Sequence, residues 1–291
     1  MNNYDDVGVV DIKRLPVNSE EHTFNDWLIK YGKSHILHSQ CNETDRCKKS
    51  QFKEACQFCI YTNSLNLSHL PEMVFPNNTL YLTHNSGVQI EFNALDALKM
   101  VSNGKLDIKV SCSETWMESR DPSNLEEKIK PFDWTFTTTY TGTISGPACV
   151  EPTDERINIE RLKEREKILF YQELMLFEDE LHDNGIAACT VKIRVMPSSY
   201  FVLLRYFLRV DGVLVRINDT RYFHDFSTNY VLREYTSKES SVKELHLPLP
   251  MFSDPNLISS YIPICSSSYE RITWPSYEQT GSSITEIEEN K

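Results

Sequence analysis

Alternating apolar and polar residues predict that much of the chain forms strands joined by tight turns. The alternation is regular over residues 79–84 and 88–92, and the turn-forming sequence Asn-Ser-Gly at 85–87 lies between them. Asn93 can cap a helix just after this hairpin, and Asp96 stands where a carboxylate suits the positive end of a helix dipole. We therefore expect a β-hairpin followed by a short helix.

A second hairpin is predicted near the middle of the C-terminal half. Residues 199–210 and 213–219 are rich in β-branched and aromatic side chains, and they flank Asp-Gly at 211–212, a strong signal for a two-residue turn. Apolar residues occupy both alternating faces, so this hairpin is expected to be central and covered on both sides. Arg205 and Arg209 interrupt one face and need acidic partners there.

The stretch from about Asp154 to His182 has a different period and predicts one long amphipathic helix. Leucine, isoleucine and phenylalanine recur there at helical spacing, a Thr-Asp pair can cap its start and Asn-Gly can end it. Between Glu173 and Asp183 the chain carries five acids and no lysine or arginine. Negative charge at the end of a helix is unfavourable, so the two arginines of the central hairpin are the expected partners of these acids.

Two further stretches, residues 105–112 and the threonine-rich residues 133–144, also predict strands. The predicted fold class is α+β: antiparallel β-sheets built from hairpins, packed with one long amphipathic helix and several short helices. We expect a single domain despite the length of the chain.

The composition varies along the chain and suggests three regions. Residues 1–68 form an N-terminal region that contains a polar, cysteine-bearing insert at 39–66, and residues 69–265 form the structured core. The serine- and glutamate-rich residues 266–291 are expected to be a disordered, acidic tail.

Charge and hydropathy exclude several classes of partner. The 291 residues carry a formal net charge of −12, so the average field repels nucleic acids and anionic lipids. No apolar run approaches the ~20 residues of a membrane-spanning helix, and the first residues do not resemble a secretory signal. We expect no nucleic-acid or membrane partner and a cytosolic location, with the nucleus as an alternative.

Four of the eight cysteines form a cluster in the sequence, Cys41, Cys47, Cys56 and Cys59. Their C-x5-C-x8-C-x2-C spacing could hold a tetrahedral zinc ion, but a zinc ribbon normally has two C-x2-C pairs and only one is present here. In a large chain without a secretory signal, reduced and scattered thiols are the favoured interpretation. The sequence therefore predicts no metal ligand, with a zinc-binding module as the open alternative.

Motifs of the common enzyme classes are missing. The sequence has no P-loop, no Rossmann glycine fingerprint, no H-E-x-x-H and no G-x-S-x-G. The acidic segment Glu178–Asp183 could be drawn as a metal-dependent catalytic site, but a solvated helix end is the simpler interpretation. We predict a non-enzymatic protein with no catalytic residue and no cofactor.

Several long segments resemble one protein family. They are HLPEMVF at 69–75, GVQIEFNALDAL at 87–98, WMESR at 116–120, IKPFDWTFTTTYTGT at 129–143, LFEDELHDNG at 176–185, VKIRVMPSSYFVLLRYFLRVDGVLVRINDTRYFH at 191–224 and YVLREYTSKES at 230–240. These segments are similar to the Tip-forty-one-like regulators of TOR signalling, called TIPRL in animals, over roughly residues 24–265.

The resemblance implies a non-enzymatic regulator that binds catalytic subunits of type 2A-like protein phosphatases, in some cases together with the Tap42/alpha-four protein. It assigns phosphatase contact to Asp96, Ile157, Ile217 and Asp219. The corresponding physical hypothesis is a groove in which the two carboxylates pair with the phosphatase and the two isoleucines bury apolar area. Each residue also has a simple structural interpretation: a helix cap for Asp96, core packing for both isoleucines, and a strand end for Asp219.

Overall fold

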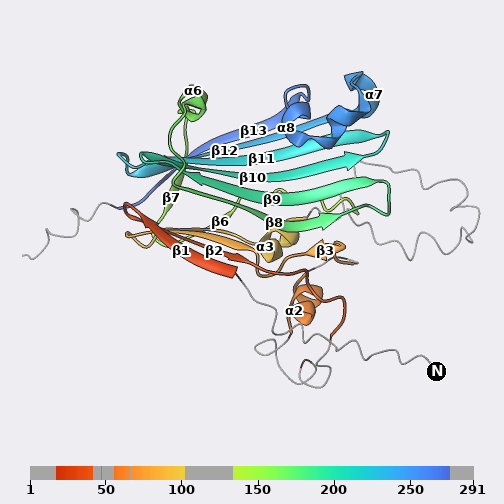
Figure 1. The fold of residues 1–291 in the computed structure, drawn as a ribbon, viewed down its shortest axis with the longest axis horizontal. Coiled ribbons are helices and arrows are strands. Elements are labelled where there is room, and N and C mark those ends of the chain that lie inside the picture. The colour runs from red at the N-terminus through yellow and green to blue at the C-terminus, as the bar shows by residue number, and fades with distance from the viewer. Residues whose placement is uncertain are drawn as a thin grey trace, which may run out of the picture.

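Hairpins assemble into two antiparallel sheets that lie face to face (Figure 1). The computed structural model describes residues 18–41, 47, 56–65, 67, 69–101 and 134–275. The smaller sheet has the order β1-β2-β4-β5-β6. Its strands are β1 (Asn18–Phe24), β2 (Trp27–Lys33), β4 (Thr79–His84), β5 (Gln89–Phe92) and β6 (Thr143–Ser145).

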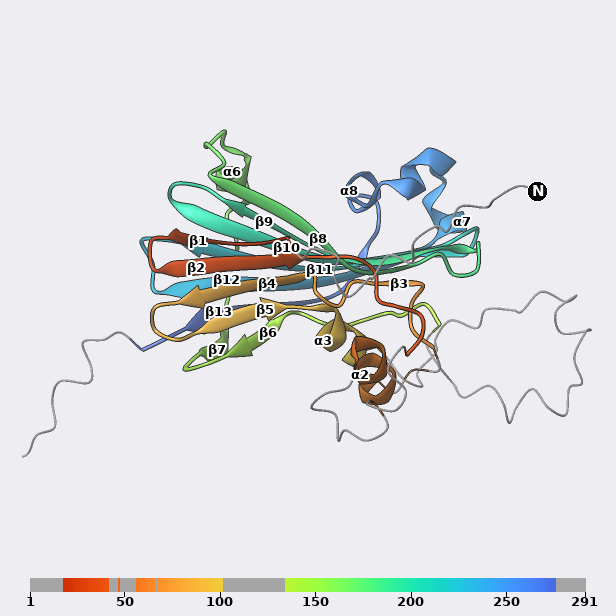
Figure 2. The ribbon, with the colours of Figure 1, turned by 60° about the horizontal axis from the view of Figure 1, so that its bottom comes forward.

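The larger sheet has eight strands in the order β3-β8-β9-β10-β11-β12-β13-β7, and every neighbouring pair is antiparallel. The strands are β3 (Met73–Val74), β7 (Cys149–Pro152), β8 (Phe170–Asp179), β9 (Gly185–Val195), β10 (Ser199–Val210), β11 (Leu214–Asp225), β12 (Tyr230–Ser241) and β13 (Ile264–Thr273). In Figure 2 the smaller sheet lies in front of this larger one, so the two sheets form the layers of a sandwich.

The main core lies between the two sheets. The inner face of the larger sheet includes Tyr200, Val202 and Leu204 of β10, and the smaller sheet contributes Trp27 and Ile29, all at most 2% exposed. The rings of Trp27 and Tyr200 meet edge to face with centroids 5.2 Å apart. Because one contiguous cluster joins both sheets, burial between the layers is the main stabilisation of the sandwich.

Both predicted hairpins are confirmed. Strands β4 and β5 pair across the Asn-Ser-Gly turn, where Gly87 has φ +88°. Strands β10 and β11 pair across Asp-Gly, where Gly212 has φ +70°, but the connection has three residues, 211–213, instead of the predicted two. A positive φ at each turn is the conformation that glycine adopts without a steric penalty, so the turn residues set the register of both hairpins.

The predicted long helix is wrong. Within residues 154–182 the structure has only the short helix α6 (Ile159–Lys163) and the ten-residue strand β8. Leu174 and Leu176 face the core with a period of two, and β8 pairs along its length with β9. The same leucines satisfy a helical and a strand period, and the neighbouring strand decides between them.

The threonine-rich stretch forms a strand only at its end, in β6. Residues 134–142 have a single bridge, between Val101 and Thr138, and otherwise cross the inner face of the larger sheet. Tyr206 donates a hydrogen bond to the carbonyl of Thr135 over 2.6 Å, and Asn218 donates one to the carbonyl of Thr138 over 3.0 Å. Side chains of the sheet therefore satisfy carbonyls that a strand would have bonded to a neighbour.

The helices of the described residues are short. They are α2 (Gln57–Ser64), α3 (Ala94–Lys99), α6, α7 (Val242–Leu245), the 3₁₀ helix η3 (Leu249–Ser253) and α8 (Pro255–Ile258). The helix predicted after Asn93 is confirmed as α3, because the Asn93 side chain accepts from the backbone N–H of Asp96 over 2.8 Å. Figure 1 shows α6, α7 and α8 on the outer face of the larger sheet and α2 on the opposite side of the molecule.

The predicted tail is wrong for its first residues, because residues 266–273 belong to β13, which pairs with β12 and β7. The rest of the tail from residue 276, and the strand predicted at 105–112, lie outside the described residues. In the part of the chain that the structure describes, no helix combines the length and apolarity needed to cross a bilayer.

Candidate functional site

The outer face of the larger sheet carries an apolar cluster at each end. Near α6, Ile157 packs with Phe223 and Leu232, and all three are buried. Near α7 and α8, Phe207 and Ile217 of the sheet pack with four further buried residues, Val215, Phe252, Ile258 and Ile262. These clusters fix the α6 segment and the α7–α8 segment on the sheet, with a strip of the sheet between them.

A buried ion pair occupies the strip between the two clusters. Arg205 and Asp219 face each other in the β10–β11 register, and the guanidinium donates to both carboxylate oxygens over 2.7 and 2.8 Å. Arg205 also donates to Asn256 of α8 over 2.8 Å, and Arg221 approaches the same carboxylate at 3.5 Å. This bidentate geometry orders the strip and holds α8 against the sheet.

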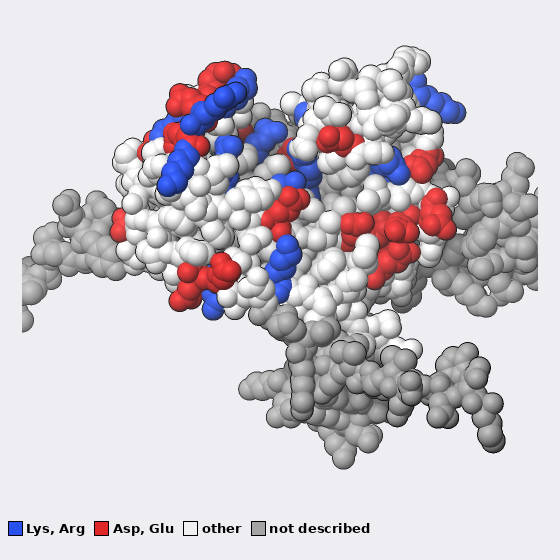
Figure 3. All heavy atoms as spheres, in the orientation of Figure 1, with Lys and Arg blue, Asp and Glu red and all other residues white. Residues whose placement is uncertain are grey.

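We name the hollow between the α6 and α7–α8 segments the outer groove, with Leu203, Arg205, Asp219 and Arg221 along its floor. Figure 3 shows the surface hollowed between the two raised segments, with basic atoms visible inside. The floor and the two walls thus form a concave surface on a sheet face that is only partly covered.

Positive charge is in excess at the groove. Arg205, Arg221 and Lys238 lie around the buried carboxylate of Asp219, and a second buried carboxylate, that of Glu234, lies opposite Arg221 in the β11–β12 register. Burial lowers the pKa of Lys238, the nearby Asp219 raises it, and Arg221 and Arg205 lower it further. Lys238 donates to the carbonyl of Ser259 over 2.6 Å at the end of α8. The groove is therefore locally basic although the whole chain has a net charge of −12.

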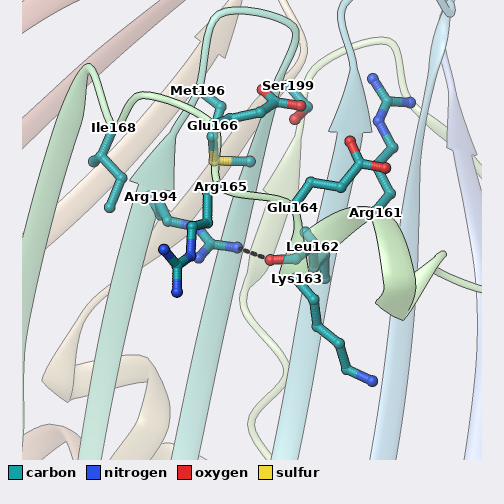
Figure 4. Close-up of a pocket in the computed structure, with 10 residues that line it drawn as sticks. All are labelled: Arg161, Leu162, Lys163, Glu164, Arg165, Glu166, Ile168, Arg194, Met196 and Ser199. Atoms are coloured by element: carbon teal, nitrogen blue, oxygen red, sulfur yellow. Dashed lines mark hydrogen bonds between the residues drawn. The ribbon is translucent and has the colours of Figure 1, made fainter.

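A pocket of about 320 Å³ lies at the α6 side, between the α6 segment and the ends of β9 and β10 (Figure 4). Arg194 crosses its floor and donates to the carbonyl of Leu162 over 3.1 Å. The titratable groups of its lining are four basic and two glutamate side chains, without histidine, cysteine or aspartate. This set offers charge for binding but no nucleophile paired with a base.

Exposed apolar side chains lie on the segments that flank the groove. Ile159 and Ile168 are 44% and 51% exposed on the α6 side, and Leu257 and Tyr261 are each 54% exposed near α8. Apolar groups beside a charged centre are typical of surfaces that bind another protein.

The acidic segment Glu178–Asp183 does not form the predicted catalytic helix end. It spans the end of β8 and a turn, where the Asp179 carboxylate accepts from the backbone N–H groups of Glu72 and Leu181 over 3.0 and 2.7 Å. Nor do these acids pair with the two arginines of the central hairpin. Arg205 bonds to Asp219 and Arg209 to Asp211, the latter over 2.7 Å.

Comparison with known proteins identifies the family of this chain. The model of the TIP41-like family matches residues 73–246, which include the central hairpin and every strand of the larger sheet except β13. The chain belongs to the TIP41-like family. It is 45% identical over 261 residues to the TIP41-like protein of Rattus norvegicus, covering 88% of this chain and 90% of the relative.

Other members of the TIP41-like family are similarly close. The human TIP41-like protein is 46% identical over 257 residues, covering 87% of this chain and 89% of the relative. A protein of Saccharomyces cerevisiae named type 2A phosphatase activator TIP41 is 35% identical over 277 residues, covering 86% of this chain and 74% of the relative.

In this TIP41-like structure, three of the four residues expected to contact a phosphatase lie on the outer face of the larger sheet. Ile157 and Ile217 belong to the two apolar clusters, and Asp219 lies on the strip between them. All three are at most 4% exposed. The Asp219 carboxylate, which we expected to pair with a partner, already pairs with Arg205 and Arg221.

Asp96 is apart from the other three. It lies on α3, which packs on the inner side of the larger sheet through Ala97 and Leu98. Its carboxylate accepts from Lys99 over 3.0 Å and from Thr143 over 2.8 Å. Burial raises the pKa of Asp96, but hydrogen bonds from Lys99, Asn93 and Thr143 outweigh this effect and lower the pKa below its usual value. The structure therefore does not bring Asp96 and Asp219 into one groove.

Sequence reasoning missed the residues that make the groove basic. Arg221 and Lys238 lie in segments that resemble the family, but neither was given a role, and the Arg205–Asp219 pair was not predicted. Counting outward from a two-residue Asp-Gly turn would have placed Arg205 opposite Asn218, whereas the three-residue connection of the structure pairs Val210 with Leu214 and Arg205 with Asp219.

Proposed function

We propose that this chain is a regulatory protein that binds the catalytic subunits of type 2A-like serine/threonine phosphatases and modulates their activity in TOR signalling. The name of the Saccharomyces cerevisiae relative, type 2A phosphatase activator TIP41, supports the link to the phosphatase. The protein acts by binding rather than by catalysis, in the cytosol or nucleus, and the Tap42/alpha-four protein is proposed as an additional partner.

The outer groove is the proposed contact with the phosphatase. The observation that carries this assignment is the position of Asp219 on the strip between the Ile157 and Ile217 clusters, on one face of one sheet. These three residues act as a framework, because they are too buried to offer much contact area themselves. Their role is to hold the arginines and the two walls in place.

Charge complementarity suggests which part of the phosphatase is recognised. Three basic side chains, Arg205, Arg221 and Lys238, face two buried carboxylates, Asp219 and Glu234, so the groove carries a small excess of positive charge. A carboxylate or another acidic group of the phosphatase would be attracted there, and the exposed apolar residues of the two walls would bury area beside it. This reverses the sequence-based hypothesis, in which the chain itself supplied the free carboxylate.

The test is a titration of the full chain against a purified type 2A catalytic subunit, followed by calorimetry or fluorescence anisotropy. Arg221→Glu is the informative variant, because this side chain is 28% exposed and approaches Asp219 only at 3.5 Å. We expect it to weaken binding at least ~10-fold, as expected for a reversed charge at an interface. The matched control is Lys30→Glu on the smaller sheet, an exposed residue outside the groove.

Two results would contradict the proposal at different levels. Absence of binding by the folded wild-type chain would reject phosphatase binding itself. Equal affinities of wild type and Arg221→Glu would leave phosphatase binding intact and reject the outer groove as its site. A phosphatase assay on a phosphopeptide, run with the same samples, measures whether binding raises or lowers the activity.

Asp96 is proposed as a second and separate contact, because the family resemblance assigns it a role and the groove does not include it. Asp96→Ala and Arg221→Glu should then weaken binding additively in the double variant, as expected for distant sites. Unchanged affinity of Asp96→Ala would leave this residue only with its hydrogen bonds to Asn93, Lys99 and Thr143.

A further inference from the structure

Four cysteine side chains converge near the start of α2. The Sγ atoms of Cys41, Cys47, Cys56 and Cys59 all lie within 4.8 Å of one another. Among the residues that the structure describes, no other group of three or more cysteine, histidine or acidic side chains brings its ligand atoms together in this way. The C-x5-C-x8-C-x2-C spacing therefore closes into one cluster instead of leaving the thiols scattered.

The distance between two of these sulfur atoms is that of metal ligands and not of a disulfide. The Sγ atoms of Cys41 and Cys56 are 3.7 Å apart, and all four thiols are free. A disulfide bond would bring two sulfur atoms to about 2.05 Å. Four thiolates at about 2.3 Å from a tetrahedral zinc ion lie about 3.8 Å from one another. The separation of Cys41 and Cys56 therefore matches two ligands of one zinc ion and not a disulfide bond.

Two anchored segments supply three of the four cysteines. The segment before Cys41 is fixed to the sandwich by the backbone hydrogen bond from Leu37 to Val74 over 2.6 Å. Cys56 is the N-cap of α2 and Cys59 lies in its first turn, while Tyr61 at 4% exposure anchors the helix in the core. Cys41, Cys56 and Cys59 thus come from parts of the chain whose positions are set by the main fold.

Helix α2 needs a stabilising crosslink. Its eight residues include a single buried side chain, Tyr61, and its Cys56 cap makes no side-chain hydrogen bond to the helix start. Isolated helices of this length are unstable in water, and a bound metal supplies the missing folding energy in small segments of this kind.

We propose that Cys41, Cys47, Cys56 and Cys59 form a structural zinc site that fastens α2 and the preceding segment to the sandwich. Four thiolates close the coordination sphere, so the ion has no open position for a substrate and no catalytic role. The site lies on the side of the molecule opposite the outer groove (Figure 1), and it is independent of the proposed phosphatase binding.

The first experiment measures metal content in the purified full chain, prepared without chelators, by inductively coupled plasma mass spectrometry. We expect about one zinc per chain. Cys47→Ser and Cys59→Ser should each reduce this to near zero. Cys149→Ser and Cys265→Ser are the matched controls, because these cysteines are exposed and lie outside the cluster, and both variants should keep the zinc.

A second measurement uses the wild-type chain, so it does not depend on a variant that folds. Replacement of the bound ion by Co²⁺ should give the intense visible and charge-transfer bands of tetrahedral cobalt thiolate. The proposal is overturned by a folded chain without stoichiometric zinc, by iron in place of zinc, by zinc that persists in Cys59→Ser, or by a disulfide found on mass spectrometry after alkylation without reduction.

Discussion

Leu203 and Leu204 are neighbours on β10, but they lie in different surroundings. Leu204 faces the smaller sheet and is 2% exposed in the main core. Leu203 is half-buried on the floor of the outer groove, beside a charged strip that only two helical segments flank. The inner face is joined into one apolar cluster, whereas the outer face has two separate clusters. This contrast indicates that stability depends mainly on the inner face and that the outer face is available for recognition.

The largest loss of stability is expected at the Arg205–Asp219 ion pair, because this part of the outer face is as buried as the inner face. Asp219→Ala would leave Arg205 buried without its carboxylate, and loss of one partner of a buried pair costs about 3–5 kcal/mol. Chemical denaturation measures this loss. A folded Asp219→Ala with wild-type stability would mean that solvent, and not Asp219, balances the arginine charge.

The control for this prediction removes both charges. Arg205→Met combined with Asp219→Leu should regain most of the lost stability, because apolar replacement of a whole buried pair is often neutral. The same double variant removes one cation and one anion, so it leaves the net charge of the groove unchanged.

The next largest loss of stability is expected at Leu204, and a comparison with Leu203 tests the contrast between the two faces directly. Leu204→Ala should cost about 2–5 kcal/mol, because it leaves a cavity in the packed core. Leu203→Ala should cost only about 1 kcal/mol, since its side chain remains partly in water. Denaturation midpoints of the two variants test this order, and equal losses would contradict the contrast between the faces.

A smaller effect, on the pH dependence of the unfolding free energy, is expected from His224 on the inner face. Burial lowers the pKa of His224 from its usual value of 6.5 to about 4, although its hydrogen bond to the Tyr230 carbonyl works in the opposite direction. The unfolded chain takes up the proton first, so this contribution to stability is complete above pH 6.5 and is lost as the pH falls toward 4.

The expected slope in that range is at most about 1.4 kcal/mol per pH unit from His224, so roughly 1 kcal/mol is lost by pH 5.5. Burial also lowers the pKa values of His69 and His84, which adds slope of the same sign. Unfolding free energies measured at several pH values should show a shallower slope in His224→Gln. An unchanged slope would assign the effect to other groups.

The smallest effect is expected for an exposed pair on the outer face. Lys192 and Glu173 are 2.8 Å apart with side chains 34% and 45% exposed. Lys192→Ala should change the unfolding free energy by less than about 1 kcal/mol, as is usual for solvent-exposed pairs. A loss comparable to that of Asp219→Ala would show that exposure does not separate the two kinds of ion pair.

Local turn chemistry explains which parts of the fold could be predicted. Gly87 and Gly212 specify their turns within a few residues, so both hairpins and the helix at Asn93 follow from the sequence. Strand β8 could not be predicted in this way. Its leucines fit two periods, and pairing with β9 determines the outcome.

The site was predicted only in part for a similar reason. The family resemblance selected Ile157, Ile217 and Asp219, which lie on one face of one sheet. Arg205 neutralises Asp219 because of the register of their strands and the burial of both side chains. Asp96 lies elsewhere because of the way in which the two sheets stack. Neither property is visible in the residue types alone.

The order of the strands along the chain has a consequence for synthesis on the ribosome. The first four strands of the smaller sheet are complete at Phe92, but the strands that cover its apolar face end at Thr273, about 180 residues later. At about 5–20 residues per second, the nascent sheet waits roughly 9–36 s for its cover. During that interval Trp27, Ile29 and Leu82 are without their final neighbours, so a chaperone that shields nascent apolar surfaces should associate with the first half of this chain.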